Sequence, residues 1–76
     1  MNNPRRKALD EIKEQVEELR MALAELLEEE QDAFDNMPEG LQCSERGEKM
    51  EDGISALEDA VGNLEECIDN IDTAIE

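Results

Sequence analysis

The side chains that could do chemistry in this sequence are carboxylates and two thiols. The chain holds 23 acidic residues, two cysteines and no histidine. Without an imidazole there is no histidine base and no Ser–His or Cys–His nucleophile pair. Paired carboxylates act as acid and base only inside a cleft, and a helical chain of 76 residues offers little concavity. We therefore expect a protein that is not an enzyme and that has no catalytic residues.

The same side chains offer few ways to hold a metal ion or a cofactor. Two acidic stretches, residues 32–36 and 69–72, lack the glycine and the closing glutamate of an EF-hand loop. Two cysteines without histidine fall short of the four ligands of a structural zinc site. No glycine-rich phosphate-binding pattern is present. The sequence predicts no cofactor and no dedicated metal site.

Charge is distributed unevenly along the chain. The net charge is −16, yet residues 1–20 carry five bases and five acids and are neutral. Beyond Lys49 there is no basic residue at all. Such a surface repels nucleic acid and anionic membranes and attracts basic partners. Phe34 is the only aromatic residue, which excludes base stacking as a means of holding single strands. We expect no direct nucleic-acid binding and no membrane binding.

Helices must position these carboxylates, because apolar residues recur at alternating spacings of three and four in both halves of the chain. We predict one helical-hairpin domain over residues 1–76, with helices over about 5–35 and 45–75 and a hinge over 36–43. The predicted helix-packing core consists of the apolar residues of both series: Leu9, Ile12, Val16, Leu19, Leu23, Leu26, Met50, Ile54, Leu57, Val61, Leu64, Ile68, Ile71 and Ile75.

The hinge contains residues that interrupt helices. Pro38 disfavours helix at the preceding residue, and Gly40 permits a positive φ angle. Asn36 is a candidate cap for a short turn, and Ser44 is a candidate N-cap for the second helix. A loop this short joins antiparallel neighbours. The predicted fold class is therefore all-α, an antiparallel, coiled-coil-like helical hairpin.

Small residues recur every seven positions along one flank of the second helix, at Gly53, Ala60, Cys67 and Ala74. Small side chains let a neighbouring helix approach closely, so we expect this flank to pack and Cys67 to be a small buried residue. The apolar stripe of the first helix is wider than a single neighbour needs, since Leu27 and Phe34 widen it on one side. Self-association as a homodimeric four-helix bundle would cover the surplus, and the alternative is that this face is reserved for the partner. The sequence also allows a monomeric hairpin or an extended dimer.

Carboxylates of the second helix form rows along its exposed side. The predicted partner-binding acidic face consists of Glu51, Asp52, Glu58, Asp59, Glu65, Glu66, Asp69 and Asp72. One hypothesis is that this face occupies a basic groove of a partner, such as a nucleic-acid-binding or defence protein, in the manner of a nucleic-acid mimic. The alternative is a structural coiled-coil subunit of an assembly or scaffold, in which acidity serves only solubility.

The hinge also carries a resemblance. Residues 37–51, Met37-Pro38-Glu39-Gly40-Leu41-Gln42-Cys43-Ser44-Glu45-Arg46-Gly47-Glu48-Lys49-Met50-Glu51, are similar to a segment of short acidic coiled-coil proteins from Gram-positive bacteria and their phages. The resemblance covers about residues 30–76. That family is largely uncharacterised, so the resemblance implies no site residues. It implies a phage or prophage accessory protein and favours an inhibitor of a host nucleic-acid-binding system.

The chain shows no signal peptide and no transmembrane stretch. Two cysteines without an export signal are typical of a reducing compartment. We expect a cytoplasmic protein, which for a phage protein means the cytosol of the host cell.

Overall fold

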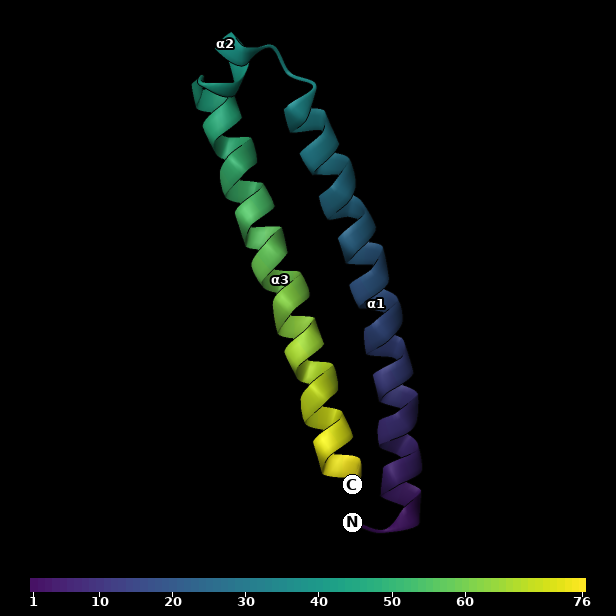
Figure 1. The fold of residues 1–76 in the computed structure, drawn as a ribbon. Coiled ribbons are helices and arrows are strands. Elements are labelled where there is room, and N and C mark those ends of the chain that lie inside the picture. The colour runs from purple at the N-terminus through teal and green to yellow at the C-terminus, as the bar shows by residue number, and fades with distance from the viewer.

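The protein, described over residues 1–76 by a computed structural model, is an all-α hairpin, as the sequence predicts. Its elements are α1 (Asn3–Asp35), α2 (Glu39–Gln42) and α3 (Glu45–Ile75), and there is no strand. The helices α1 and α3 lie side by side in opposite directions, with α2 at one end and both termini at the other (Figure 1). The result is a rod with extents of 58 × 14 × 12 Å.

Side-chain caps explain where the two long helices begin. The Asn2 side chain accepts a hydrogen bond of 2.9 Å from the Arg5 amide, so α1 begins two residues earlier than predicted. Pro4 fits this first turn, where its missing amide hydrogen is not needed. The predicted Ser44 cap of α3 is confirmed, because the Ser44 hydroxyl accepts from the Gly47 amide at 3.3 Å.

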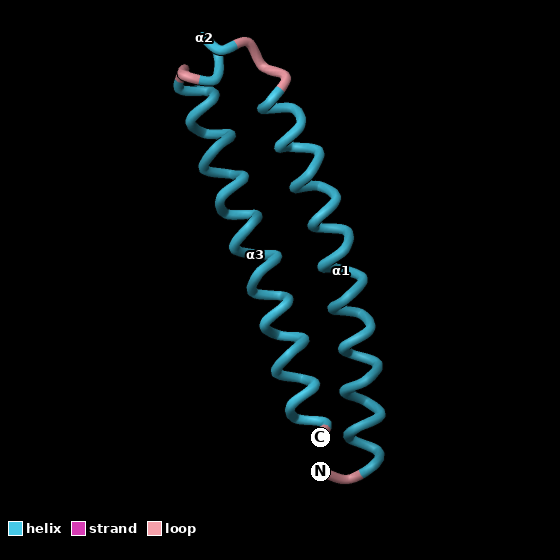
Figure 2. The backbone as a smooth tube through the Cα atoms, in the orientation of Figure 1, coloured by secondary structure: helices cyan, strands magenta, loops and turns pink.

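The hinge differs from the prediction in detail. Non-helical backbone is confined to short stretches around α2 and to the chain ends (Figure 2). Gly40 lies within α2 and no glycine has a positive φ, so the predicted use of its conformational freedom is wrong. Asn36 ends α1 instead of capping a new turn, and Pro38 precedes α2. The fixed φ of Pro38, −55°, already suits the start of a helical turn.

A close backbone approach fixes the angle between α2 and α3. Gly47 is buried in the first turn of α3, and a Cβ atom there would overlap the backbone carbonyl of Gln42. The Gln42 side chain also donates a hydrogen bond of 2.8 Å to the carbonyl oxygen of Phe34 near the end of α1. The hinge is therefore held to both long helices, and Gly47 is the position where only glycine fits.

The seam between α1 and α3 contains most of the predicted core. Ile54 is the one buried hydrophobic residue, with 6% of its surface exposed. The other predicted core residues of α3 are half-buried, as are Leu9, Val16 and Leu23 of α1. A pair of helices has only one layer of contact, so its seam stays partly open on both sides.

The predicted core is wrong at three positions of α1. Ile12, Leu19 and Leu26 have 47%, 62% and 56% of their surface exposed. The half-buried residues in α1 instead include Arg6, Lys13, Arg20, Leu27 and Phe34. The apolar stripe of α1 is wider than the contact with one neighbouring helix, so α3 covers one edge of the stripe and leaves the other to solvent.

Candidate functional site

The predicted acidic face lies along α3. Seven of its eight members are exposed: Glu51, Asp52, Glu58, Asp59, Glu65, Glu66 and Asp69. Six of them form three neighbouring pairs that repeat every seven residues, a step of about 10.5 Å along a helix, and Asp69 follows the last pair. Since they share one continuous helix capped by Ser44, these carboxylates form a regular linear array.

Asp72 is the exception within the acidic face. It is half-buried, and its Oδ1 atom lies 2.5 Å from Nζ of Lys13 on α1. The hydrogen bond from Lys13 to Asp72 raises the pKa of the Lys13 ammonium above its ordinary value of 10.5, and the charges of Asp72, Glu17 and Asp10 raise it further. Asp72 therefore serves the hairpin, and its charge is already balanced.

Residues of α1 flank the acidic face on one side. Glu17 and Arg20 line a shallow depression together with Glu65, Ile68 and Asp69 of α3. A second depression lies nearer the hinge, lined by Gln31, Phe34, Glu51, Ile54, Ser55 and Glu58. Both are open surface features in which carboxylates outnumber bases, so this flank attracts cations.

One cluster of acidic residues was not predicted from the sequence. Glu25, Glu28, Glu29 and Asp32 surround a shallow hollow on the outer surface of α1, with no apolar residue in its lining. The signal was present in the uninterrupted acidic run of residues 28–30. The acidic surface thus extends from α3 onto the hinge-proximal half of α1.

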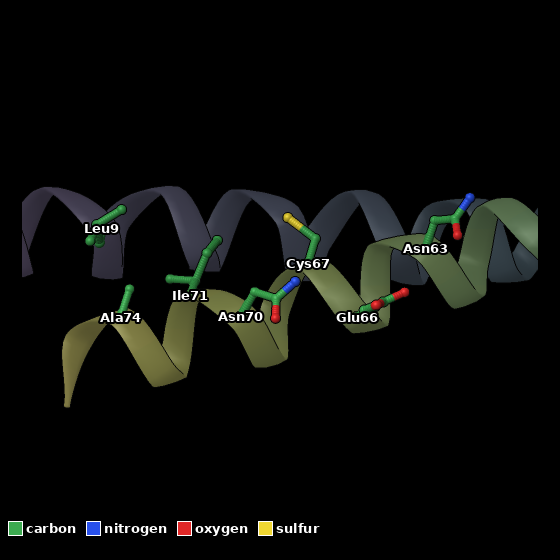
Figure 3. A pocket seen from close by; sticks show the side chains of 7 residues that line it. All are labelled: Leu9, Asn63, Glu66, Cys67, Asn70, Ile71 and Ala74. Atoms are coloured by element: carbon green, nitrogen blue, oxygen red, sulfur yellow. The ribbon is translucent and has the colours of Figure 1, made fainter.

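The opposite flank of the hairpin has a different character. A hollow of about 410 Å³ near the chain ends is lined by Leu9 of α1 and, from α3, by Asn63, Glu66, Cys67, Asn70, Ile71 and Ala74 (Figure 3). Of the small residues predicted to pack, Ala60 and Cys67 are half-buried, and Gly53 and Ala74 are exposed. The expectation that Cys67 is buried is met only in part, because α1 covers one side of this row.

No group of three or more acidic or cysteine side chains is placed to hold a metal ion. None of the helices combines the length and the apolar character needed to cross a membrane. None of the protein-family models, curated proteins or solved structures compared with this chain matches it.

Proposed function

We propose that this protein is a non-enzymatic binding protein whose acidic face occupies a basic, nucleic-acid-binding groove of a partner protein. The observation that carries the proposal is the exposure of seven carboxylates in a regular array on α3, with no base on that helix beyond Lys49. Like charges close together on one helix lower its stability. Solubility alone requires a smaller net charge than this array contributes to, so solubility does not account for the missing bases.

Charge density supports the same interpretation. The rod carries −16 over 58 Å, or one net negative charge per about 3.6 Å. Duplex DNA carries one per roughly 1.7 Å of axis over its two strands, and one per 3.4 Å on each strand. A single hairpin therefore presents about the linear charge of one strand. A groove lined by lysine and arginine would accept the hairpin and exclude its nucleic acid.

A phage-type inhibitor of a host defence or other nucleic-acid-binding protein is the form of this function that we favour. Such an inhibitor acts in the cytosol of the host cell. The two free cysteines, Cys43 and Cys67, fit a reducing compartment.

A structural role in an assembly is the second candidate. The observation that favours it is the exposure of Ile12, Leu19 and Leu26, because large apolar side chains in a row mark a surface that packs. In that case the acidic face would keep the rods soluble and would bind nothing.

Neutralising acids on one surface distinguishes the two candidates. The test variant is Glu51→Gln/Glu58→Gln/Glu65→Gln, which leaves Asp72 and its ion pair with Lys13 intact. The matched control is Glu11→Gln/Glu14→Gln/Glu18→Gln, which removes the same charge from exposed positions of α1 that lie outside the acidic surface. Each variant is used as bait for nucleic-acid-binding proteins in a lysate, with elution by salt and by duplex DNA.

The proposal expects the unaltered protein and the control to retain a nucleic-acid-binding protein that salt or DNA releases, and the test variant to lose it. Equal retention by all three proteins, or a partner that stays bound in high salt and excess DNA, would contradict it. Circular dichroism of each variant checks that the helices are intact.

A further inference from the structure

The exposed apolar edge of α1 forms a row of residues spaced by seven: Ile12, Leu19, Leu26 and Ala33. This row shares a side of the hairpin with the small-residue row of α3. In an antiparallel pair, the helix flanks that carry Glu17 and Gln31 on α1 and Glu51, Glu58 and Glu65 on α3 meet on one side. The remaining two flanks meet on the other. That side carries Leu19 and Leu26 from α1 and Ala60 and Cys67 from α3.

Two further rows complete this side. Each lies on its helix next to the row already named, farther from the contact between α1 and α3. On α1 the outer row is Ala8, Gln15, Ala22 and Glu29. On α3 the outer row is Lys49, Ala56, Asn63 and Asn70. We call the four rows together the neutral face. Glu29 is its only acid and Lys49 its only base, in a chain with a net charge of −16.

The neutral face is more apolar and less charged than the rest of the rod. All ten acids of α3 lie outside it. Ile12, Leu19 and Leu26 lie within it, and these are the large exposed hydrophobic residues of α1 other than Met21. It therefore combines exposed apolar surface with an absence of the charge that covers the rest of the rod.

We propose that the neutral face binds the neutral face of a second copy of this chain, giving a four-helix bundle. This inference is independent of the function proposed above. A basic partner would find almost nothing to pair with on this face, whereas a second acidic hairpin can approach only here without bringing carboxylates together.

The elongated rod exposes enough area for a standard interface with a second subunit. The single chain exposes 5683 Å². A folded monomer of 8.6 kDa exposes about 4,700 Å² by the usual scaling of surface with mass. The difference, about 1,000 Å², is similar to the roughly 800 Å² that each partner buries in a standard interface.

Charge distribution selects the orientation of the two copies. Residues 21–62, the hinge half of the rod, hold 13 acids and two bases, a net charge of −11. The half that contains the chain ends holds the remaining −5. Placing the hinges at opposite ends of the bundle sets each strongly charged half against a weakly charged one, which minimises repulsion.

This orientation makes specific contacts. The register of the hairpin, with Lys13 beside Asp72 and Phe34 near Ile54, brings the centre of the α1 row and the centre of the small-residue row to the same level. A two-fold axis there places Leu19 of one copy against Leu26 of the other. On the other helix it places Ala60 against Cys67. Small side chains let the two α3 helices approach closely.

The bundle also doubles the charge without lengthening the rod. Two copies carry −32 over the same 58 Å, one charge per about 1.8 Å. That density is close to the roughly 1.7 Å spacing of duplex DNA. The acidic faces of both copies remain outside.

Sedimentation equilibrium tests the face. We expect the unaltered protein to show twice its 8.6 kDa mass and Leu19→Glu to show the single mass with its helical circular dichroism retained. The matched control is Met21→Glu, because Met21 is 60% exposed, like Leu19 at 62%, but lies on the opposite side of α1. A monomeric unaltered protein, or equal dissociation by both substitutions, overturns the proposal.

Disulfide trapping tests the orientation. In a Cys43→Ser background, Ala60→Cys places the introduced thiol of each copy against Cys67 of the other, so mild oxidation should link most of the dimer on a non-reducing gel. Adding Cys67→Ser should abolish the link, because the two introduced thiols then lie seven positions, about 10.5 Å, apart along the bundle. Hinges at the same end would set α3 against α1 and give no link, which would overturn the orientation.

Discussion

Lys13 and Asp72 join the two ends of the chain: their Nζ and Oδ1 atoms lie 2.5 Å apart across the seam. Lys13 also approaches Glu17 on its own helix at 4.0 Å. This contact marks the register in which α3 lies against α1. It also explains why Asp72 is the one member of the predicted acidic face that is half-buried.

The contact between Lys13 and Asp72 should make the folded protein less stable at alkaline pH. Because the hydrogen bond to Asp72 raises the pKa of Lys13 in the folded state, its stabilising effect is complete below the ordinary value of 10.5. It is lost as pH rises through the raised pKa. We expect Lys13→Met to melt below the unaltered protein at neutral pH, and this difference in Tm to shrink as the pH rises above 10.5 and through the raised pKa. Lys7→Met, at an exposed position without an ion pair, should leave Tm nearly unchanged across the same range.

Gly47 should tolerate no larger residue. Gly47→Ala places a Cβ against the Gln42 carbonyl and within 2.6 Å of the Leu41 carbonyl oxygen, so backbone must move. We expect a loss of about 1–3 kcal/mol in the free energy of unfolding, measured with urea. Gly62→Ala is the control, because its Cβ would meet nothing within 4 Å. Removing that exposed glycine should stabilise the helix by about 0.5–1 kcal/mol. Equal effects of the two substitutions would show that the hinge approach is not tight.

Ile54 should dominate the packing of the seam. Ile54→Ala removes the one buried hydrophobic side chain and should cost about 2–4 kcal/mol of unfolding free energy. Met21→Ala, at a position 60% exposed, should change it by less than about 0.5 kcal/mol. A small effect at Ile54 in thermal or urea unfolding would mean that the seam is held elsewhere.

Salt should act in opposite directions on the two interactions proposed for this chain. The Debye length falls from about 30 Å at 0.01 M to about 3 Å at 1 M. Self-association through the neutral face should strengthen over this range, because repulsion between two copies of charge −16 is screened. Binding of a basic partner to the acidic face should weaken. Sedimentation equilibrium and partner pull-down at matched salt concentrations measure the two effects separately.

A dimer that dissociates as salt rises would point to ion pairs across its interface and contradict an uncharged one. Partner binding that strengthens with salt would likewise contradict an electrostatic role for the acidic face.

Local signals in the sequence were enough to predict the two long helices, but not α2 within the hinge. The 3–4 spacing of apolar residues predicts both long helices, and Ser44 marks the start of α3 because its hydroxyl satisfies an amide of the first turn. The exposure of Glu51, Glu58 and Glu65 also follows from the sequence, since their positions lie off the apolar stripe. The helical conformation of Gly40 and the burial of Gly47 could not be predicted from the sequence, because each depends on how α2 packs against the long helices.

Only the tertiary structure decided which edge of the α1 stripe is covered. Both edges, one with Leu9, Val16 and Leu23 and the other with Ile12, Leu19 and Leu26, have helical periodicity, and the sequence predicts burial for both. A single neighbouring helix contacts one edge, and pairing across the seam, including Lys13 with Asp72, determines which one. Helical periodicity identifies the apolar residues that can be buried, but the position of the neighbouring helix determines which of them are buried.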